Sequence, residues 1–171
     1  MIQSLSAQDL SCIRGNRLVF RDLSFSLRAG EALAIEGANG AGKTSLLRML
    51  AGFLAPAGGA IRLQADNDNV DDADERGKFV GWLGHHDAVK PQMSPRETLR
   101  FFCGFYGSSA PVDDALEAVG LSRIADLPSL YLSAGQRKRL ALARLKLSQR
   151  PLWLLHEPLA ALDASGKALV A

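Results

Sequence analysis

Eight consecutive residues, GANGAGKT at positions 37–44, constrain the fold of this chain more than any other segment. They match the pattern G-x-x-x-x-G-K-[ST], in which glycines let the backbone curl until successive amides point inward at phosphate oxygens. A short apolar run at 32–35 precedes the motif, and leucines at helical spacing follow it within 45–53. A strand buried on both faces, a glycine loop and a helix in this order predict an α/β nucleotide-binding domain.

Each position of the motif has a physical role in holding a triphosphate. The helix that follows the loop presents free amides and a positive dipole end to the same anion. Lys43 supplies a point charge to the β- and γ-phosphates, and the Thr44 hydroxyl is a ligand for Mg²⁺. The alternative is a chance glycine-rich turn, but the strand before and the helix after favour phosphate binding. The predicted nucleotide-binding residues are Gly37, Ala38, Asn39, Gly40, Ala41, Gly42, Lys43, Thr44 and Ser45, with Thr44 as the metal ligand.

Charge, cysteines and hydropathy exclude several classes of protein. The chain has 171 residues and a net charge of +2, so it carries no large basic field and we expect no nucleic-acid partner. Cys12 and Cys103 stand alone, which favours small buried side chains in a reducing cytoplasm over a disulfide framework. No signal-peptide pattern opens the chain, and no apolar run of roughly 18 residues could span a bilayer.

Further strands and helices follow from periodicity and from residues typical of helix ends. Strands are expected at 18–27, 79–83 and 152–155, the last buried. A helix is expected to begin after Ser94, where Pro95 suits the first position and Glu97 completes a capping box, and to end at Gly107. Two more helices are expected over 113–119 and 135–147. The acid-rich stretch 66–75 lacks the glycine and glutamate of a calcium loop, and we expect a solvated loop there.

The segment 132–136 resembles the LSGGQ signature of ABC ATPases, with Ala134 in place of the first glycine. In that family the signature reaches across a head-to-tail dimer and binds the γ-phosphate held by the partner's loop. A serine hydroxyl, backbone amides and a helix N-terminus suit an anion. The alternative is a capped surface helix, because Ser133 is also a good N-cap. The residues carried over as the signature, acting in trans, are Leu132, Ser133, Ala134, Gly135 and Gln136.

The segment 152–158 resembles the Walker B strand of the same family. The resemblance places Glu157 at the catalytic position, where a carboxylate orients or deprotonates the attacking water. Asp163 falls in the D-loop at the dimer interface. The resemblance implies one nucleotide-binding domain over 1–171: a P-loop NTPase core of α/β class, an N-terminal antiparallel β part and a helical subdomain at about 94–147. The chain is expected to be C-terminally incomplete after the D-loop, before the family's switch histidine.

Outside the signature segment, two positions depart from the family pattern and one family role has no assigned residue. His156 stands where the family has an aspartate that holds Mg²⁺, and a neutral imidazole predicts weaker Mg²⁺ binding and slow hydrolysis. His86, with His85 next, is the best match to the Q-loop glutamine, the alternative being an exposed loop histidine. Phe20, Arg14 and Arg17 are all candidates for the side chain that stacks on adenine, and the sequence does not distinguish between them.

Within the ABC family, the chain most resembles the cytochrome c biogenesis ATP-binding export proteins. The similarity rests on LSAGQ followed by RKRLALARL, on Leu83-Gly84-His85, and on the ending PLWLLHEPLAALD. It implies ATP and Mg²⁺ as cofactors, a homodimer of nucleotide-binding domains, and integral-membrane partners of a cytochrome c maturation complex. The protein would then lie peripherally on the cytoplasmic side of the bacterial inner membrane and power haem export or haem-chaperone release.

Other functions remain open at this stage. One is the ATPase of another exporter. A second is a nucleotide-binding module impaired in hydrolysis or truncated, which His156 and the ending at Ala171 support. A soluble ABC protein acting on ribosomes is a weaker third, because such chains carry two nucleotide domains.

Overall fold

A computed structural model describes residues 1–66, 68–84, 87–160, 162 and 166. The chain forms two compact units, Met1–Val80 and Gly81–Ala171. Each unit has its own sheet and its own helices, so each is described by itself.

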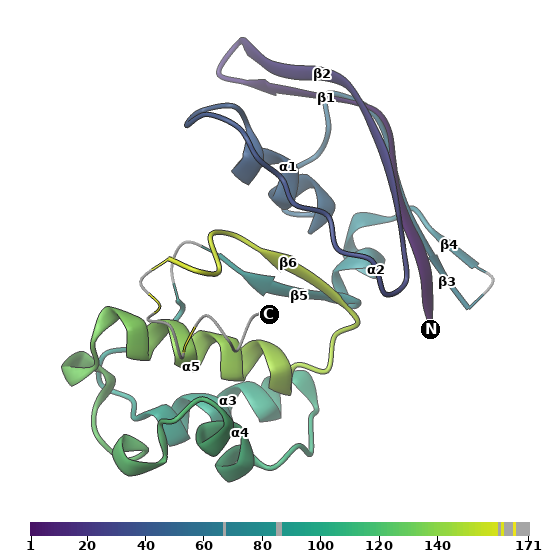
Figure 1. The fold of residues 1–171 in the computed structure, drawn as a ribbon. Helices are drawn as coiled ribbons and strands as arrows, with labels where there is room; N and C mark the ends of the chain where they lie inside the picture. The colour runs from purple at the N-terminus through teal and green to yellow at the C-terminus, as the bar shows by residue number, and fades with distance from the viewer. Residues whose placement is uncertain (67, 85–86, 161, 163–165, 167–171) are drawn as a thin grey trace. The chain divides into compact units, whose positions relative to one another are not determined.

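The first unit is built on a four-stranded antiparallel sheet with the strand order β2-β1-β3-β4 (Figure 1). The bounds are β1 (Ile2–Arg14), β2 (Arg17–Arg28), β3 (Gly58–Ala65) and β4 (Asp68–Val70). Gly15 and Asn16 join β1 to β2, and both have positive φ, of 53° and 62°, as a tight two-residue hairpin turn requires. The expected strand at 18–27 is confirmed, and the antiparallel β part expected at the N-terminus is present.

A bulge bends β1 in its middle. The pairing of β1 with β2 shifts register between Ala7 and Leu10, where Asp9 has φ 48°. Ser24 on β2 stabilises the bulge: its hydroxyl accepts a hydrogen bond from the Asp9 amide at 2.8 Å and donates one to the Asp9 carboxylate at 3.1 Å. On the other side of β1, a Cβ at Gly59 would lie 2.3 Å from the carbonyl oxygen of Gln8. The bend therefore requires a glycine on β3.

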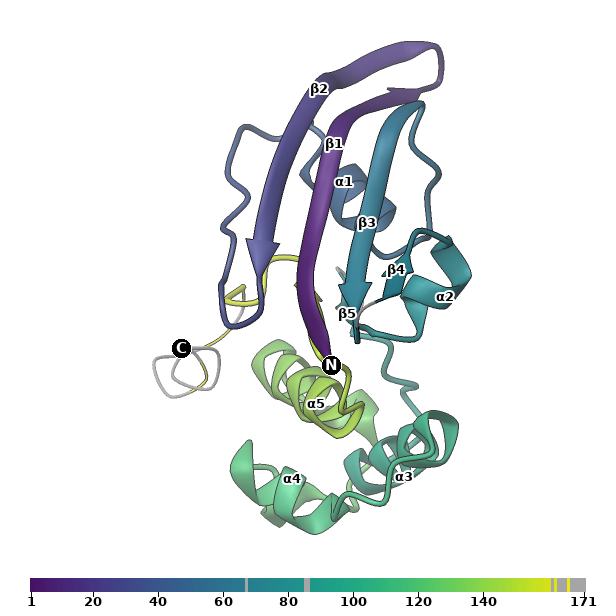
Figure 2. The same cartoon turned by 90° about the vertical axis from the view of Figure 1, so that its right-hand side faces the viewer.

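Helix α1 (Lys43–Leu50) lies along one face of this sheet (Figure 2). Its buried side chains are Leu46, Leu47, Met49 and Leu50. The apolar spacing that predicted a helix after the glycine loop is thereby confirmed.

The acid-rich stretch is more ordered than the solvated loop we expected. It forms strand β4 and the short helix α2 (Ala73–Gly77), whose N-cap Asp72 accepts hydrogen bonds from the amides of Asp74 and Glu75. Arg76 is buried and donates to the carbonyl oxygens of Leu50 at 3.0 Å and Asp71 at 3.1 Å. Local capping and one buried arginine thus give this polar segment a fixed fold.

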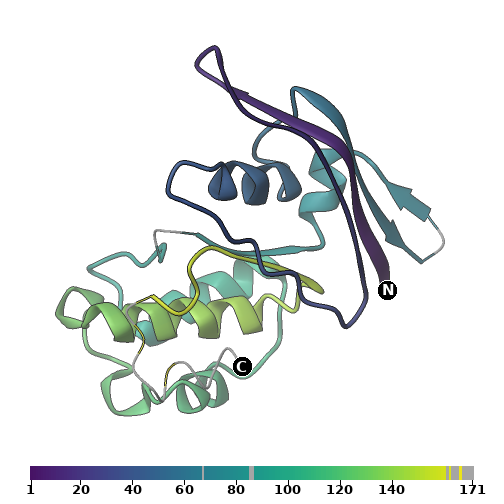
Figure 3. The same ribbon diagram turned by 45° about the horizontal axis from the view of Figure 1, so that its top comes forward.

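The second unit is centred on helix α5 (Ala134–Leu147), which lies between a two-stranded sheet and two other helices (Figures 1 and 3). The sheet pairs β5 (Val80–Leu83) with β6 (Leu152–Leu155), and the helices are α3 (Pro95–Tyr106) and α4 (Val112–Ala118). Two 3-10 turns, η1 (Ser122–Ile124) and η2 (Ser129–Tyr131), lead to α5. One face of α5 packs on α3 and α4 through Leu140, Ala143 and Leu147, and Ala141, Leu142 and Leu145 pack toward the strands.

The helix ends follow the sequence closely. The Glu97 amide donates to Ser94 Oγ at 3.2 Å and the Glu97 carboxylate accepts from the Ser94 amide at 2.8 Å, which completes the predicted capping box. Helix α3 ends at Gly107 as predicted, and α4 and α5 agree with the expected helices to within one residue at most bounds. Cys12 and Cys103 are free and buried, as predicted.

Two expectations about strands need correction. The run 32–35 was expected to be a strand buried on both faces, but it has no regular secondary structure and Leu33 is 47 % exposed. A doubly buried strand needs partner strands, and in the described part of the first unit the sheet consists of β2, β1, β3 and β4. Strand β6 forms as predicted, but Trp153 is 48 % exposed, so the strand is buried on one face. No helix among the described residues is long and apolar enough to cross a membrane.

Candidate nucleotide-binding site

The glycine loop leads directly into α1 through Gly42, the helix N-cap, which has φ 99°. A Cβ at this position would lie 2.7 Å from Val19 Cγ1 and 2.9 Å from Phe20 Cδ1 on β2. Both the positive φ and the close approach therefore require glycine. Gly42 supplies no side-chain cap, so the first-turn amides of α1 keep their capacity to bind an anion.

Lys43 folds back over this loop. Its ammonium donates hydrogen bonds to the carbonyl oxygens of Gly37 at 2.6 Å and Ala38 at 2.9 Å. The Ala41 amide also donates to the Ala38 carbonyl, at 3.2 Å, which closes a turn within the motif. The loop residues 37–41 are exposed to solvent. A cation, an uncapped helix start and an open loop together form a cradle that fits a phosphate group.

A metal ion at this site would depend on the nucleotide for most of its ligands. Thr44 is exposed at the start of α1, beside the glycine loop. In the described ranges, no three His, Cys, Asp or Glu side chains come together as a metal site. A single hydroxyl completed by phosphate oxygens and water matches the way Mg²⁺ is usually held.

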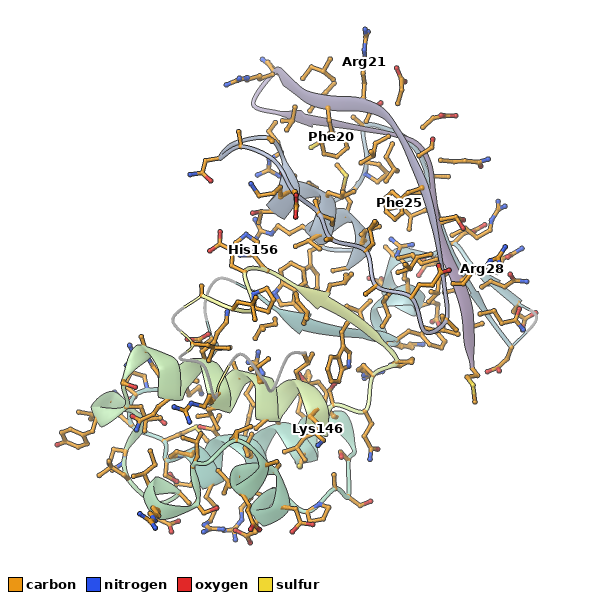
Figure 4. All side chains as sticks on the ribbon, in the orientation of Figure 1. Phe20, Arg21, Phe25, Arg28, Lys146 and His156 are labelled. Atoms are coloured by element: carbon orange, nitrogen blue, oxygen red, sulfur yellow. The ribbon has the colours of Figure 1, made fainter. Side chains whose placement is uncertain are left out.

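Phe20 projects from β2 toward the side of α1, whereas Arg21 points away from it (Figure 4). Contact with the loop at Gly42 explains why Phe20 is half-buried. Arg14 and Arg17 are exposed at the end of the β1–β2 hairpin. None of these three residues is singled out by the geometry as the adenine-stacking side chain.

The segment 132–136 forms the start of α5 and has a capping box of its own. The Gln136 amide donates to Ser133 Oγ at 3.2 Å, and the Ser133 amide donates to Gln136 Oε1 at 2.8 Å. Arg137 donates to the Leu132 carbonyl at 2.5 Å, and Leu132 itself is buried. The capped helix start of the alternative interpretation is present, but α5 is not a surface helix, because most of its side chains from Lys138 onward are buried. The capping box does not conflict with the signature, because Ser133 is exposed at a helix N-terminus.

His156 directly follows strand β6 (Figure 4), and Glu157 is the next residue in the sequence. The His156 amide donates to the Leu83 carbonyl at 2.8 Å and thus continues the pairing of β6 with β5. Glu157 is exposed and has φ 48°, although it precedes Pro158, where extended backbone is the rule. Such a left-handed residue costs on the order of 1–3 kcal/mol, and strained residues of this kind cluster at functional sites.

His85, His86 and Asp163 fall outside the described residues. Leu162, beside Asp163, is described and is packed with Ala141, Leu142 and Leu145. Residues 37–45 belong to the first unit, and 132–136, His156 and Glu157 belong to the second.

Sequence reasoning missed one group of charged residues in the second unit. Lys138 and Arg144 are buried on α5, and Asp87 lies beside Lys138. A signal was present, because Lys138 shares the helical spacing of the apolar residues Ala141 and Leu145.

Comparison with protein families agrees with the motifs. Residues 20–160 match the family model described as ABC transporter. The "Cytochrome c biogenesis ATP-binding export protein CcmA" of Rhodopseudomonas palustris (strain BisB18) is 52 % identical over 168 residues, covering 98 % of this chain and 82 % of that protein. The protein of the same name from Hyphomonas neptunium is 48 % identical over 166 residues, covering 97 % and 79 %.

Solved structures show the same fold. A putative ABC transporter ATP-binding protein from Pyrococcus furiosus matches with a TM-score of 0.83 and 25 % identity, over 98 % of this chain and 82 % of that one. A bacterial Atm1-family ABC exporter with ATP bound matches with a TM-score of 0.83 and 24 % identity, over 99 % of this chain and 31 % of that one.

Proposed function

The chain belongs to the ABC transporter family and, within it, to the cytochrome c biogenesis ATP-binding export proteins, and on that premise we propose that it binds and hydrolyses Mg²⁺-ATP at residues 37–45. The observation that carries the proposal is the position of Lys43 over the loop, 2.6 Å from the Gly37 carbonyl oxygen, next to an uncapped helix start. An arriving β- or γ-phosphate exchanges these carbonyl contacts for a stronger pairing with the ammonium.

The remaining site residues have complementary roles in this proposal. The Thr44 hydroxyl holds Mg²⁺, which spreads the phosphate charge when bound. Glu157, exposed after β6, orients the attacking water or accepts its proton. The Ser133 end of α5 binds the γ-phosphate of a second copy, so the working form is a homodimer, with Asp163 at the interface. His86 takes the position of the Q-loop glutamine.

We further propose that this subunit acts on a membrane complex. Its relatives carry the name of a cytochrome c biogenesis export protein, and haem is the cargo that we assign to the complex. Integral-membrane subunits are then its partners, and the protein lies peripherally on the cytoplasmic face of the inner membrane. Residues 1–171 belong to one nucleotide-binding domain with a helical subdomain at about 94–147.

A second candidate function rests on His156. Where an aspartate would bring a full negative charge to Mg²⁺, the imidazole brings none when neutral, and Mg²⁺ prefers oxygen ligands. The chain would then bind ATP and dimerise but turn over slowly. The substitution His156→Asp, which supplies a carboxylate at this position, distinguishes active hydrolysis from the impaired module.

The test compares ATP binding and phosphate release in the wild type, Glu157→Gln and His156→Asp. Active hydrolysis predicts turnover by the wild type that Glu157→Gln abolishes while ATP binding persists. The impaired module predicts tight binding with negligible turnover, and a gain of turnover in His156→Asp. A wild type that fails to bind Mg²⁺-ATP at millimolar concentration would contradict both.

A further inference from the structure

Two cations are buried in α5, the helix whose first turn carries the signature segment. Lys138 is 6 % exposed and Arg144 is 5 % exposed. A buried charge is costly unless it is paired or hydrogen-bonded, so each of these side chains needs a partner.

Arg144 has partners on the two neighbouring elements. Its guanidinium lies 4.8 Å from the ring centroid of Phe102 on α3 and reaches the Trp82 carbonyl oxygen on β5 at 3.5 Å. Burial lowers the pKa of Arg144, and the nearby Tyr106 and Asp87 oppose that shift. The guanidinium is thus held between helix and strand, with Asp87 close enough to contribute to its electrostatics.

Lys138 pairs with Asp87, which follows β5 and directly succeeds His86 in the sequence. The Lys138 ammonium lies 3.9 Å from Asp87 Oδ1. That oxygen is buried and has no hydrogen-bond donor among the described residues. The Asp87 side chain is 22 % exposed. The carboxylate is therefore attached to α5 by charge alone, at a separation that a small movement would convert into a direct hydrogen bond.

We propose that Asp87 is a positioning residue that couples the loop after β5 to the signature end of α5. Through Lys138, two residues after Gln136 on the same helix, it sets the position of the helix start that presents Ser133 and Gly135 to the partner's nucleotide. The inference rests on the proposed function, since it gives a role to α5 only if ATP closes a dimer. It goes beyond that function by naming a charge pair that touches no nucleotide.

The test removes the negative charge of Asp87 and, in a second variant, exchanges the two charged residues of the pair. Asp87→Asn keeps the shape and loses the charge, Asp87→Glu keeps the charge, and Asp87→Lys/Lys138→Asp exchanges the two. Asp126→Asn is the matched control, because Asp126 also forms an ion pair in this unit, with Arg96 at 2.8 Å, but is exposed. Each variant is assayed for the ATP dissociation constant, for kcat and KM, and, with Glu157→Gln added, for ATP-driven dimerisation by sedimentation.

The expected pattern separates positioning from folding. Asp87→Asn should weaken ATP-driven dimerisation and lower kcat by about tenfold, the scale of a typical coupling between sites, with ATP affinity and KM within about twofold of the wild type. Asp87→Glu and the exchanged pair should recover most of the loss, and Asp126→Asn should change none of these quantities.

Opposite outcomes overturn the proposal. An Asp87→Asn protein that unfolds more easily but dimerises and turns over normally assigns the pair to stability alone. Should Asp87→Asn fail to fold, the exchanged pair decides: normal folding with defective dimerisation contradicts the role of the contact. A wild type that does not bind ATP refutes this inference and the proposed function together, whereas a binding wild type with an unaffected Asp87→Asn refutes this inference alone.

Discussion

The ammonium of Lys43 donates a hydrogen bond of 2.6 Å to the carbonyl oxygen of Gly37, which lies in the loop that precedes the helix of Lys43. Together with the bond to Ala38, this contact keeps the cation over the loop rather than extended into solvent. The site is thus organised before a nucleotide arrives, and less side-chain freedom is lost on binding than for an unrestrained lysine.

Lys43→Ala should therefore abolish tight ATP binding. Removal of the ammonium leaves the phosphate charge uncompensated, and we expect affinity to fall by about 100-fold or more, the scale of a broken charge pair of roughly 3 kcal/mol. Calorimetry or fluorescent-nucleotide titration measures the loss. Lys78→Ala is the control, since Lys78 is an exposed lysine of the same unit that pairs with Glu75 at 2.6 Å. Equal affinity in wild type and Lys43→Ala would refute the site.

Ser133→Ala and Ser94→Ala form a second matched pair, because both serines cap a helix through a complete capping box. Each substitution should lower the free energy of unfolding by about 1 kcal/mol. Only Ser133→Ala should also lower ATP turnover, because only that helix start is proposed to meet a nucleotide. Urea unfolding and phosphate release measure the two effects. Equal loss of turnover in both variants would show that Ser133 acts through stability alone.

The sequence predicted those parts of the fold that are determined locally. Ser94, Glu97 and Gly107 fix the ends of α3 whatever surrounds them, and the spacing of Leu46, Leu47 and Leu50 is sufficient to place α1. The run 32–35 was mispredicted because an apolar composition does not supply partner strands. The sequence did not predict the burial of Arg76 or the helix α2. Arg76 lies next to a run of charged residues, and its hydrogen-bond partner Leu50 becomes a neighbour only in the folded chain, whereas Asp71 lies close to it in the sequence.

In the candidate site, too, the sequence predicted the contiguous motif but not the contacts between distant segments. The loop 37–44 is a contiguous motif, so the sequence could name each residue and its chemistry. The close approach of Gly42 to Val19 and Phe20 on β2 joins segments that are separated in the sequence, so it could not be read from the motif. The pairing of Asp87 with Lys138 joins residues 51 positions apart (138 − 87) and could be found only from the structure.

Gly42→Ala should disrupt the loop sterically. The residue has φ 99°, and its Cβ would lie 2.7 Å from Val19 Cγ1, so the loop and β2 must separate. We expect a loss of at least about 1 kcal/mol in unfolding free energy from the backbone alone, with a marked loss of ATP affinity. Gly59→Ala is the control, because it is strained at β3 against Gln8 and should destabilise the unit with ATP affinity retained in the folded fraction. Unchanged ATP affinity in Gly42→Ala would contradict the proposed close fit.

The ion pairs of Arg96 should make stability depend on pH in the acidic range. The hydrogen bond from Arg96 lowers the pKa of Asp126, so the folded state holds this proton less tightly than the unfolded state does. The stabilisation is present above the unfolded pKa of about 4 and is lost as pH falls through the lower folded value. The midpoint of unfolding should therefore depend less on pH, from about pH 5 downward, in Asp126→Asn than in the wild type. An identical pH profile in both proteins would show that the pair contributes nothing in solution.

Cys103 should resist alkylation in the folded protein. Burial raises the pKa of its thiol, which is packed among Leu99, Leu116 and Leu140, so less of the reactive thiolate is present at neutral pH. Mass spectrometry after iodoacetamide at pH 8 should show modification of Cys103 at least about tenfold slower in the native protein than in urea, since both access and thiolate fraction are reduced. A Cys12→Ala background restricts the signal to Cys103. Native and unfolded proteins that react at the same rate would mean that α3 and α4 open readily, and the packing of α5 against them would then need revision.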